Sequence, residues 1–310
     1  MSRGLSGSPQ EQFLLLSNSV RLSAAISHQR EYTLSTSPTI SFIGAGNMAS
    51  AIIGGMLESG FEAGKIWVSA PDDGHLQSIR KKFGVSVTTD NRHCAQQADM
   101  VILAVKPQVM RNVCVDIAPV VQNTRPLMVS IAAGLAATTL DQWLGGGMPM
   151  VRVMPNTPSL VGKGAAGLYA NDQVKDKQKT MVESVFSSIG SALWVEDESL
   201  LHAVTALSGS GPAYFFLMLE ALEEAATGAG LPAETARKLA IQTMAGAAEM
   251  AGRSEHDPGQ LKRNVMSPGG TTEQAIHTFE DGGLRELVKK AYSAAYDRSG
   301  EMSKELAAKQ

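Results

Sequence analysis

A glycine-rich turn that joins a β-rich run to a helical stretch is the feature that most constrains how this chain folds. Residues 40–43 read Ile-Ser-Phe-Ile and lead directly into a G-x-G-x-x-A segment that starts at Gly44. At these positions Gly44 permits a tight turn, Gly46 lets the backbone approach a pyrophosphate, and Ala49 lets the next helix lie close to a sheet. The alternative is a glycine turn without a ligand. The strand-turn-helix context favours a dinucleotide site, in which the N–H groups at the helix start bind the phosphates.

β-rich runs and helical stretches alternate from Thr39 to about Asp197, which is typical of βαβ units that build a parallel sheet. We expect strands at Thr39–Ile43, Ile66–Ser69, Met100–Ala104, Leu127–Ile131, Met150–Met154, Ala165–Tyr169 and Ala192–Val195. We expect helices between them at Asn47–Ser59, His75–Phe83, Val109–Ala118, Thr138–Leu144 and Asp176–Ile189.

The chain changes character after about Glu198, where long stretches rich in Ala, Leu, Met and Glu replace the strand-like runs. Glycine and proline divide this half into expected helices at Tyr214–Gly228, Ala233–Ala251, Thr271–Phe279 and Leu284–Leu306. Small residues around Gly246 let helices approach closely, either within one chain or across a subunit interface. We therefore expect an extension (1–37), a Rossmann-type domain with a mostly parallel sheet (38–197) and an all-α domain (198–310).

Bulk properties exclude several classes of protein. The 310 residues suffice for two domains, and the net charge of −3 leaves no broad basic surface for a nucleic-acid partner. The longest apolar run near the N-terminus, Phe13–Leu16, is too short to cross a membrane. Cys94 and Cys114 are too few for a disulfide framework, so we expect a cytoplasmic protein. The Ser-rich residues 1–37 are expected to be a flexible extension, with organelle targeting as the alternative.

Residues at the ends of the predicted strands indicate which dinucleotide binds. The second strand ends in Val68-Ser69-Ala70-Pro71, without the acid that would repel a 2′-phosphate, although Asp72 and Asp73 follow closely. We therefore favour NADPH, with NADH also usable. Another strand stops at Lys106-Pro107, which brings a cation to the edge where ligands bind, and a solvated turn lysine is the alternative.

A second candidate site lies in the helical half. Gly269 and Gly270 precede Thr271 and Thr272 at a predicted helix start, which concentrates free N–H groups and hydroxyls in one place. This arrangement suits a carboxylate, and a capped helix behind a tight turn is the alternative. We expect no metal site, because the six histidines show no ligand spacing: His28, His75, His93, His202, His256 and His277.

Together these residues resemble the pyrroline-5-carboxylate reductase family from about Pro38 to Leu306. The resemblance rests on Phe42–Met48, Ala104–Pro107, Asn156–Pro158, Leu207–Tyr214 and His256–Thr272. It implies a small imino-acid substrate and a helical domain that interlocks with that of a partner chain. The expected assembly is a homodimer whose active site draws on both subunits, and dimers of this family assemble further, up to a decamer.

The resemblance also implies roles for individual residues. The cofactor is expected to contact Gly44, Gly46, Asn47, Met48, Ser69, Ala70, Asn91, Ala104, Val105, Lys106, Pro107, Ala132 and Thr205. The substrate is expected to contact Glu198, Glu255, Asn264, Thr271 and Thr272. Of these, Thr272 and Glu255 are the expected catalytic residues.

The chemistry expected is reduction of 1-pyrroline-5-carboxylate to L-proline by NAD(P)H, the last step of proline biosynthesis. A protonated C=N accepts hydride far better than a neutral one, so Glu255 is expected to face the ring nitrogen. The proton comes from Thr272 or from water, because threonine alone is a weak acid. The alternatives are a 3-hydroxyacid dehydrogenase, with Lys262 as its acid-base residue, and a non-catalytic nucleotide-binding scaffold.

Overall fold

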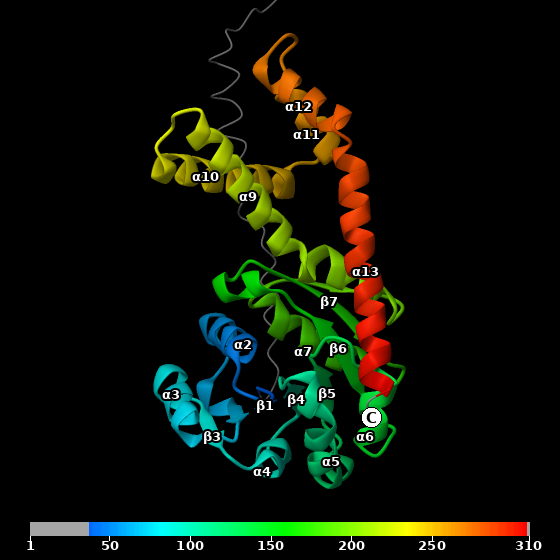
Figure 1. The fold of residues 1–310 in the computed structure, drawn as a ribbon. Coiled ribbons are helices and arrows are strands. Elements are labelled where there is room, and N and C mark those ends of the chain that lie inside the picture. Colours follow the sequence, from blue (N-terminus) through cyan, green and yellow to red (C-terminus); the bar gives the residue numbers. More distant parts are fainter. Residues whose placement is uncertain (1–36, 309–310) are drawn as a thin grey trace, which may run out of the picture. The chain divides into compact units, whose positions relative to one another are not determined.

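A single mixed sheet places the glycine-rich turn near its middle. The computed structural model describes residues 37–308, and in this part of the chain eight strands form the order β3-β2-β1-β4-β5-β6-β7-β8 (Figure 1). The strands are β1 (Ile40–Ile43), β2 (Ile66–Ser69), β3 (Ser86–Thr88), β4 (Met100–Leu103), β5 (Leu127–Ser130), β6 (Met150–Met154), β7 (Gly164–Ala170) and β8 (Gly190–Trp194). The predictions for residues 1–37 lie outside the described residues, apart from Ser37.

Neighbouring strands run parallel except β6 and β7, which pair antiparallel. From β1 the chain first builds β2 and β3 on one side and then crosses to β4 on the other. The carboxyl ends of β1 and β4 therefore lie at a topological switch point, where open α/β sheets bind ligands. The predicted fold class is confirmed. The predictions omitted β3, because this half-buried Ser-Val-Thr edge strand has no apolar run to mark it.

Helices cover both faces of the sheet, because side chains along a strand alternate between two apolar clusters. These helices are α2 (Asn47–Glu58), α3 (Asp73–Phe83), α4 (Asn91–Gln96), α5 (Pro107–Thr124), α6 (Ala137–Trp143) and α7 (Asp176–Ser187). On β4, Met100 and Ile102 pack with α2, α3 and α7, whereas Val101 and Leu103 pack with α4, α5 and α6. Burial on both faces explains the continuous apolar runs that predicted the strands.

The prediction that the helix expected at Val109–Ala118 ends at Ala118 is wrong. Helix α5 continues through Pro119 to Thr124. Its buried side chains, Met110, Cys114, Ile117 and Val121, keep helical spacing across the proline. Burial of Val121 against the sheet therefore outweighs the local cost of the proline.

After β8 the described chain is helical. The elements are α8 (Leu200–Val204), a π-helical turn η3 (Thr205–Gly209), α9 (Gly211–Gly228), α10 (Ala233–Arg253), α11 (Pro258–Asn264), α12 (Thr271–Asp281) and α13 (Leu284–Ala308). Among the helices of residues 37–308, none combines the length and the apolar character that crossing a membrane requires.

Close packing joins the first helical turns to the sheet. A Cβ atom on Gly167 of β7 would lie 2.7 Å from Val204, and one on Gly209 would lie 2.8 Å from Met154. The Asn156 side chain donates to Ser208 O at 2.9 Å. Residues Pro38–Gln310 form one compact unit, so the predicted domain boundary between residues 197 and 198 stays a prediction.

Two adjacent glycines of α2 provide a test of this packing. A Cβ on Gly55 would meet Ile189 and lie 2.7 Å from Ser188 O, whereas one on Gly54 would lie 3.6 Å from Phe83. Both substitutions gain similar helix propensity, so we expect Gly54→Ala to raise the free energy of unfolding by up to about 1 kcal/mol. Gly55→Ala should lower it by roughly 1–3 kcal/mol through overpacking. Urea denaturation measures both, and equal effects would contradict the packing described.

Candidate functional site

The turn after β1 is held between the strands on both sides of it. Gly44 has φ +111°, and its N–H donates to Ser69 O at 2.8 Å. A Cβ atom on Gly44 would lie 2.6 Å from the backbone oxygen of Ala104. Only glycine accommodates both the dihedral angle and the contact. Backbone contacts therefore fix the turn at the carboxyl ends of β1, β2 and β4.

The next glycine faces open space instead. Gly46 is the N-cap of α2, and a Cβ atom built on it meets nothing within 4 Å. No side chain caps this helix, and its first turn carries no acid, so the N–H groups of Asn47, Met48 and Ala49 are available to a ligand. An uncapped helix start with free space before it fits the pyrophosphate of a dinucleotide.

The ends of β2 and β3 form the expected ribose side of this site. Ser69 Oγ donates to Asn91 Oδ1 at 2.8 Å, which joins the end of β2 to the first residue of α4. Asp72 caps α3 by accepting the N–H of His75 at 3.0 Å. No motif in the sequence marks His75 as a site residue, yet its Nε2 lies 2.7 Å from Ala45 O, so its side chain reaches the glycine-rich turn.

Two further strand ends complete the edge. Ala104 N donates to Ile43 O at 2.8 Å, and Val105, Lys106 and Pro107 follow as the chain enters α5. Beyond β5, the N–H of Ala132 donates to Ser130 Oγ at 3.3 Å. The structure thus brings most of the predicted cofactor residues to one edge of the sheet: Gly44, Gly46, Asn47, Met48, Ser69, Ala70, Asn91, Ala104, Val105, Lys106, Pro107 and Ala132.

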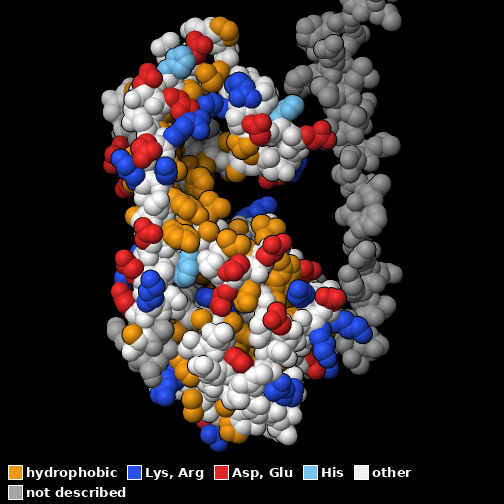
Figure 2. All heavy atoms as spheres, turned by 90° about the vertical axis from the view of Figure 1, so that its right-hand side faces the viewer, with side chains coloured by type: hydrophobic (Ala, Val, Ile, Leu, Met, Phe, Trp, Pro, Cys, Tyr) orange, Lys and Arg blue, Asp and Glu red, His pale blue; other side chains and the backbone are white. Residues whose placement is uncertain are grey.

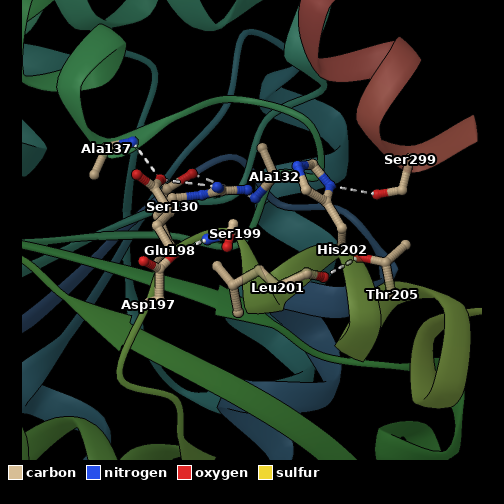
Figure 3. A network of polar contacts seen from close by, with 11 residues as sticks. Ser130, Ala132, Ala137, Asp197, Glu198, Ser199, Leu201, His202, Thr205 and Ser299 are labelled. Carbon is tan, nitrogen blue, oxygen red and sulfur yellow. Dashed lines mark hydrogen bonds and ion pairs between the residues drawn. The ribbon is translucent and has the colours of Figure 1, made fainter. Parts of the chain in front are cut away.

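Two predicted residues lie where the sheet meets the helical half. The Thr205 hydroxyl, in the π-helical turn, donates to Leu201 O at 2.7 Å. Glu198 Oε1 accepts Nη1 of the buried Arg152 at 2.9 Å and the N–H of Ala137 at 2.6 Å (Figure 3). Arg152 was not among the predicted site residues, because it lies inside the strand Met150–Met154 and no motif marks it.

His202 lies beside this ion pair and contacts a helix from the far end of the chain. Its Nδ1 lies 2.9 Å from Ser299 Oγ on α13 (Figure 3). Burial lowers the pKa of His202, and the Arg152 charge lowers it further. The neutral imidazole is therefore favoured, which suits a hydrogen bond to a hydroxyl group.

The predicted carboxylate site is a second, separate cluster. Gly270 is the N-cap of α12 and has no capping side chain, and Thr271 and Thr272 are the first helical residues. Glu273 reaches back from the first turn to accept the N–H of Gly269 at 2.8 Å. Asn264 accepts a hydrogen bond from Gln260 on α11, and Glu255 is exposed. No side chain caps the N–H groups at the start of α12, and the role of this cluster in binding a carboxylate stays a prediction.

Helix α13 separates the two clusters. Near its C-terminal end, Leu306 packs against the Gly134 loop next to Ala132, whereas its N-terminal end follows α12. Its 25 residues span about 37 Å. The cofactor residues and the Thr271 cluster of one chain therefore lie at opposite ends of a long helix (Figure 1).

Comparisons with known proteins match both halves of the chain. The family model described as pyrroline-5-carboxylate reductase dimerisation matches residues 198–302, and the one described as NADP oxidoreductase, coenzyme F420-dependent, matches residues 39–134. The pyrroline-5-carboxylate reductase of Pseudomonas aeruginosa is 46% identical over 271 residues, which cover 87% of this chain and 99% of that protein. That of Pisum sativum is 39% identical, covering 87% and 98%.

Solved structures of pyrroline-5-carboxylate reductases also superpose on this chain. The pyrroline-5-carboxylate reductase of Coxiella burnetii superposes with a TM-score of 0.84 at 45% identity, covering 86% of this chain and 99% of that one. The Plasmodium falciparum enzyme, solved with NADP bound, has a TM-score of 0.75 at 31% identity, covering 86% and 98%.

The open space at Gly46 yields a test of the phosphate site. Gly46→Val should fold normally, because its φ of −74° suits any residue, but the added side chain fills the space before the N–H groups. We expect the Kd for NADPH to rise at least about tenfold. Fluorescence titration with NADPH measures this Kd, and the melting temperature shows whether the variant folds normally. Gly64→Val is the control. A Cβ atom on Gly64 also meets nothing within 4 Å, but Gly64 lies before the N-terminal end of β2, away from the edge that carries the glycine-rich turn. Unchanged NADPH binding in Gly46→Val would exclude this phosphate site.

Proposed function

Because the chain belongs to the pyrroline-5-carboxylate reductase family and catalyses the NAD(P)H-dependent reduction of 1-pyrroline-5-carboxylate to L-proline, we propose that each active site combines two subunits. One protomer supplies the cofactor edge of its sheet, and its partner supplies the Thr271 cluster. The observation that carries this proposal is the separation of these two groups by about 37 Å of helix within one chain.

The surface of the helical half supports a partner chain. Phe215, Phe216 and Leu217 on α9 are each at least 60% exposed, and Leu287 on α13 is 64% exposed. Figure 2 shows hydrophobic side chains gathered on the helical half. Apolar surface of this extent marks a protein interface. Residues 198–302 are a dimerisation domain, so the chain forms a homodimer. Assembly of dimers into a decamer is a further part of the proposal.

In the proposed mechanism, the backbone N–H groups of Thr271 and Thr272 bind the substrate carboxylate at the start of α12. The helix dipole there favours an anion. Glu255 faces the protonated ring nitrogen, whose positive charge makes the C=N carbon a better hydride acceptor. Thr272 or a water molecule supplies the nitrogen's proton, and Asn264 contacts the substrate. The bound nicotinamide supplies the hydride, and the protein's contribution is orientation and electrostatics.

The state of Lys262 argues against a 3-hydroxyacid dehydrogenase. That chemistry needs a strong acid-base group, and Lys262 was the candidate. Its Nζ instead donates to Glu280 at 3.0 Å, and Glu280 also accepts Arg285. These two cations lower the pKa of Glu280 to about 2, with Arg285 the larger cause. Lys262 therefore joins α11 to α12 as part of an ion-pair cluster.

The proposed location is the cytoplasm, with organelle targeting by residues 1–37 as the alternative. Cys94 and Cys114 are buried free thiols, and burial raises their pKa to about 11 and about 12. Thiols of this kind suit a reducing compartment.

Steady-state kinetics test the role of Thr272. Thr272→Ala should lower kcat for NADPH oxidation by pyrroline-5-carboxylate roughly 10- to 100-fold, because the variant lacks the hydroxyl at the ring nitrogen. The Kd for NADPH should not change. Thr278→Ala is a matched control on α12, since its hydroxyl only donates to Gln274 O within the helix. The assay follows nicotinamide absorbance and proline formed in equal amount. NADPH binding without any turnover by the wild-type protein would favour the non-catalytic scaffold.

Mixed dimers test the shared active site. With NADPH held well below its Kd for the Gly46→Val variant, Gly46→Val and Thr272→Ala should each retain at most about a tenth of wild-type activity, one for weak cofactor binding and the other for lack of the hydroxyl. In a hybrid dimer one site receives both defects and the other receives neither. After unfolding and refolding of an equal mixture, random pairing should restore about a quarter of wild-type activity, since half the dimers are hybrids with one intact site. A mixture as inactive as its components would show that each site is built from one chain.

A further inference from the structure

The ion pair between Arg152 and Glu198 stands in a place where the fold does not need charge. Arg152 lies on β6 between the buried Val151 and Val153, and its own exposed fraction is 7%. Removing a guanidinium from water is costly even beside a carboxylate, here that of Glu198 with 24% of its side chain exposed, and apolar residues of similar size often stabilise such a position better. Nε of Arg152 is also buried without a hydrogen-bond partner in the described structure. Packing alone therefore does not account for this pair.

The carboxylate of Glu198 acts on a helix start far away in the sequence. Helix α6 begins at Ala137, and its N-cap residue, Ala136, has no side chain that can cap it. Glu198 Oε1 takes over this role by accepting the Ala137 N–H at 2.6 Å, across 61 residues of chain. A negative charge at a helix start is favourable. Arg152 Nη1 donates to the same oxygen at 2.9 Å, so strand β6 fixes the position of the Glu198 carboxylate.

This cap fixes one end of the loop formed by residues 131–136. The other end is fixed at Ser130, whose hydroxyl accepts the N–H of Ala132. Ser130 and Arg152 are also direct partners in the pairing of β5 with β6. The loop that follows β5 at the cofactor edge is thus held at both ends by neighbouring residues of two adjacent strands.

A third support comes from α13. One helical turn after Glu198, His202 contacts Ser299 on α13 at 2.9 Å (Figure 3). The same helix places Leu306 against Gly134, where a Cβ atom would lie 2.8 Å from its Cδ1. Gly134 has φ +80°, a conformation that favours glycine. The middle of the loop is therefore covered by a helix that is joined to the segment carrying Glu198.

We propose that Arg152 and Glu198 are positioning residues for hydride transfer. Through Ala137 they hold the 131–136 loop, and with it Ala132, in the place where Ala132 contacts the cofactor. This inference rests on the proposed function, in which Ala132 contacts the cofactor. It also differs from the substrate contact that the family resemblance implied for Glu198. Glu198 Oε1 is occupied by Arg152 and Ala137, and these two contacts account for the orientation of the carboxylate without a substrate.

The test compares Glu198→Gln and Arg152→Met with Asp116→Asn. Asp116 forms an exposed ion pair with Arg92, so the control removes a carboxylate charge from the same half of the protein. In both test variants kcat should fall roughly 10- to 100-fold, as expected when reacting atoms are displaced by about 1 Å. The KM for pyrroline-5-carboxylate and the Kd for NADPH should stay within about threefold of wild type. The isotope effect with NADPH deuterated at the transferred position should increase.

The double variant Arg152→Met with Glu198→Gln separates positioning from stability. It removes both charges, so its melting temperature should exceed those of the single variants. Its kcat should nevertheless stay low, because the cap on Ala137 lacks its charge and its anchor. If one of the single variants does not fold, the kcat of the double variant is compared with that of Asp116→Asn instead. Hydrogen exchange at Ala132 and Ala137 should be faster than in Asp116→Asn.

Several results would overturn the proposal. A higher KM for the imino acid with unchanged kcat would make Glu198 a substrate contact. Recovery of kcat together with stability in the double variant would make the pair purely structural. If Glu198→Gln and Arg152→Met have the same kcat and KM as Asp116→Asn, the ion pair has no role in turnover. A wild-type protein without activity would instead refute the proposed function, and hydrogen exchange would still test whether the ion pair fixes the loop.

Discussion

Every part of the cofactor edge depends on the contact between the Gly44 turn and its two neighbouring strands. The backbone of Gly44 bonds to β2, and its Cα lies against the backbone of Ala104 beyond β4. Because these contacts involve backbone atoms, they leave no freedom in where α2 begins. The uncapped N–H groups of that helix therefore stand in open space at the switch point of the sheet.

A second constraint is the length and rigidity of α13. One end of this helix covers the Gly134 loop, and the other follows the helix that starts with Thr271. The cofactor edge and the Thr271 cluster of one chain lie at the two ends of this helix, and in the proposed active site they come from different chains. The exposed aromatic side chains of α9 and the match to a dimerisation domain agree with this reading. In that proposal dimerisation is required for catalysis, because dissociation would leave each active site incomplete.

The ion pair between the buried Arg152 and the partly exposed Glu198 shows how electrostatics can connect these constraints. Arg152 and Glu198 link β6, the first residue of α6 and the segment that leads into the helical half. The interaction is directional, whereas apolar packing at the same place would allow small shifts between elements. A reaction that depends on the distance between two atoms benefits from such a connection.

The sequence by itself determined the strands that carry continuous apolar runs, the glycine-rich turn and the helix start at Thr271, because each depends on neighbours in the chain. It also identified the family, through segments such as His256–Thr272. It did not indicate β3, the continuation of α5 through Pro119, or the partnership of Arg152 with Glu198, which are 46 residues apart. Those features exist only once strands pair and helices pack, since burial and long-range contact outweigh local preference there. Tertiary structure alone decided that the cofactor edge and the Thr271 cluster lie at opposite ends of α13. The distance between them depends on how this helix packs against the sheet rather than on which residues form it.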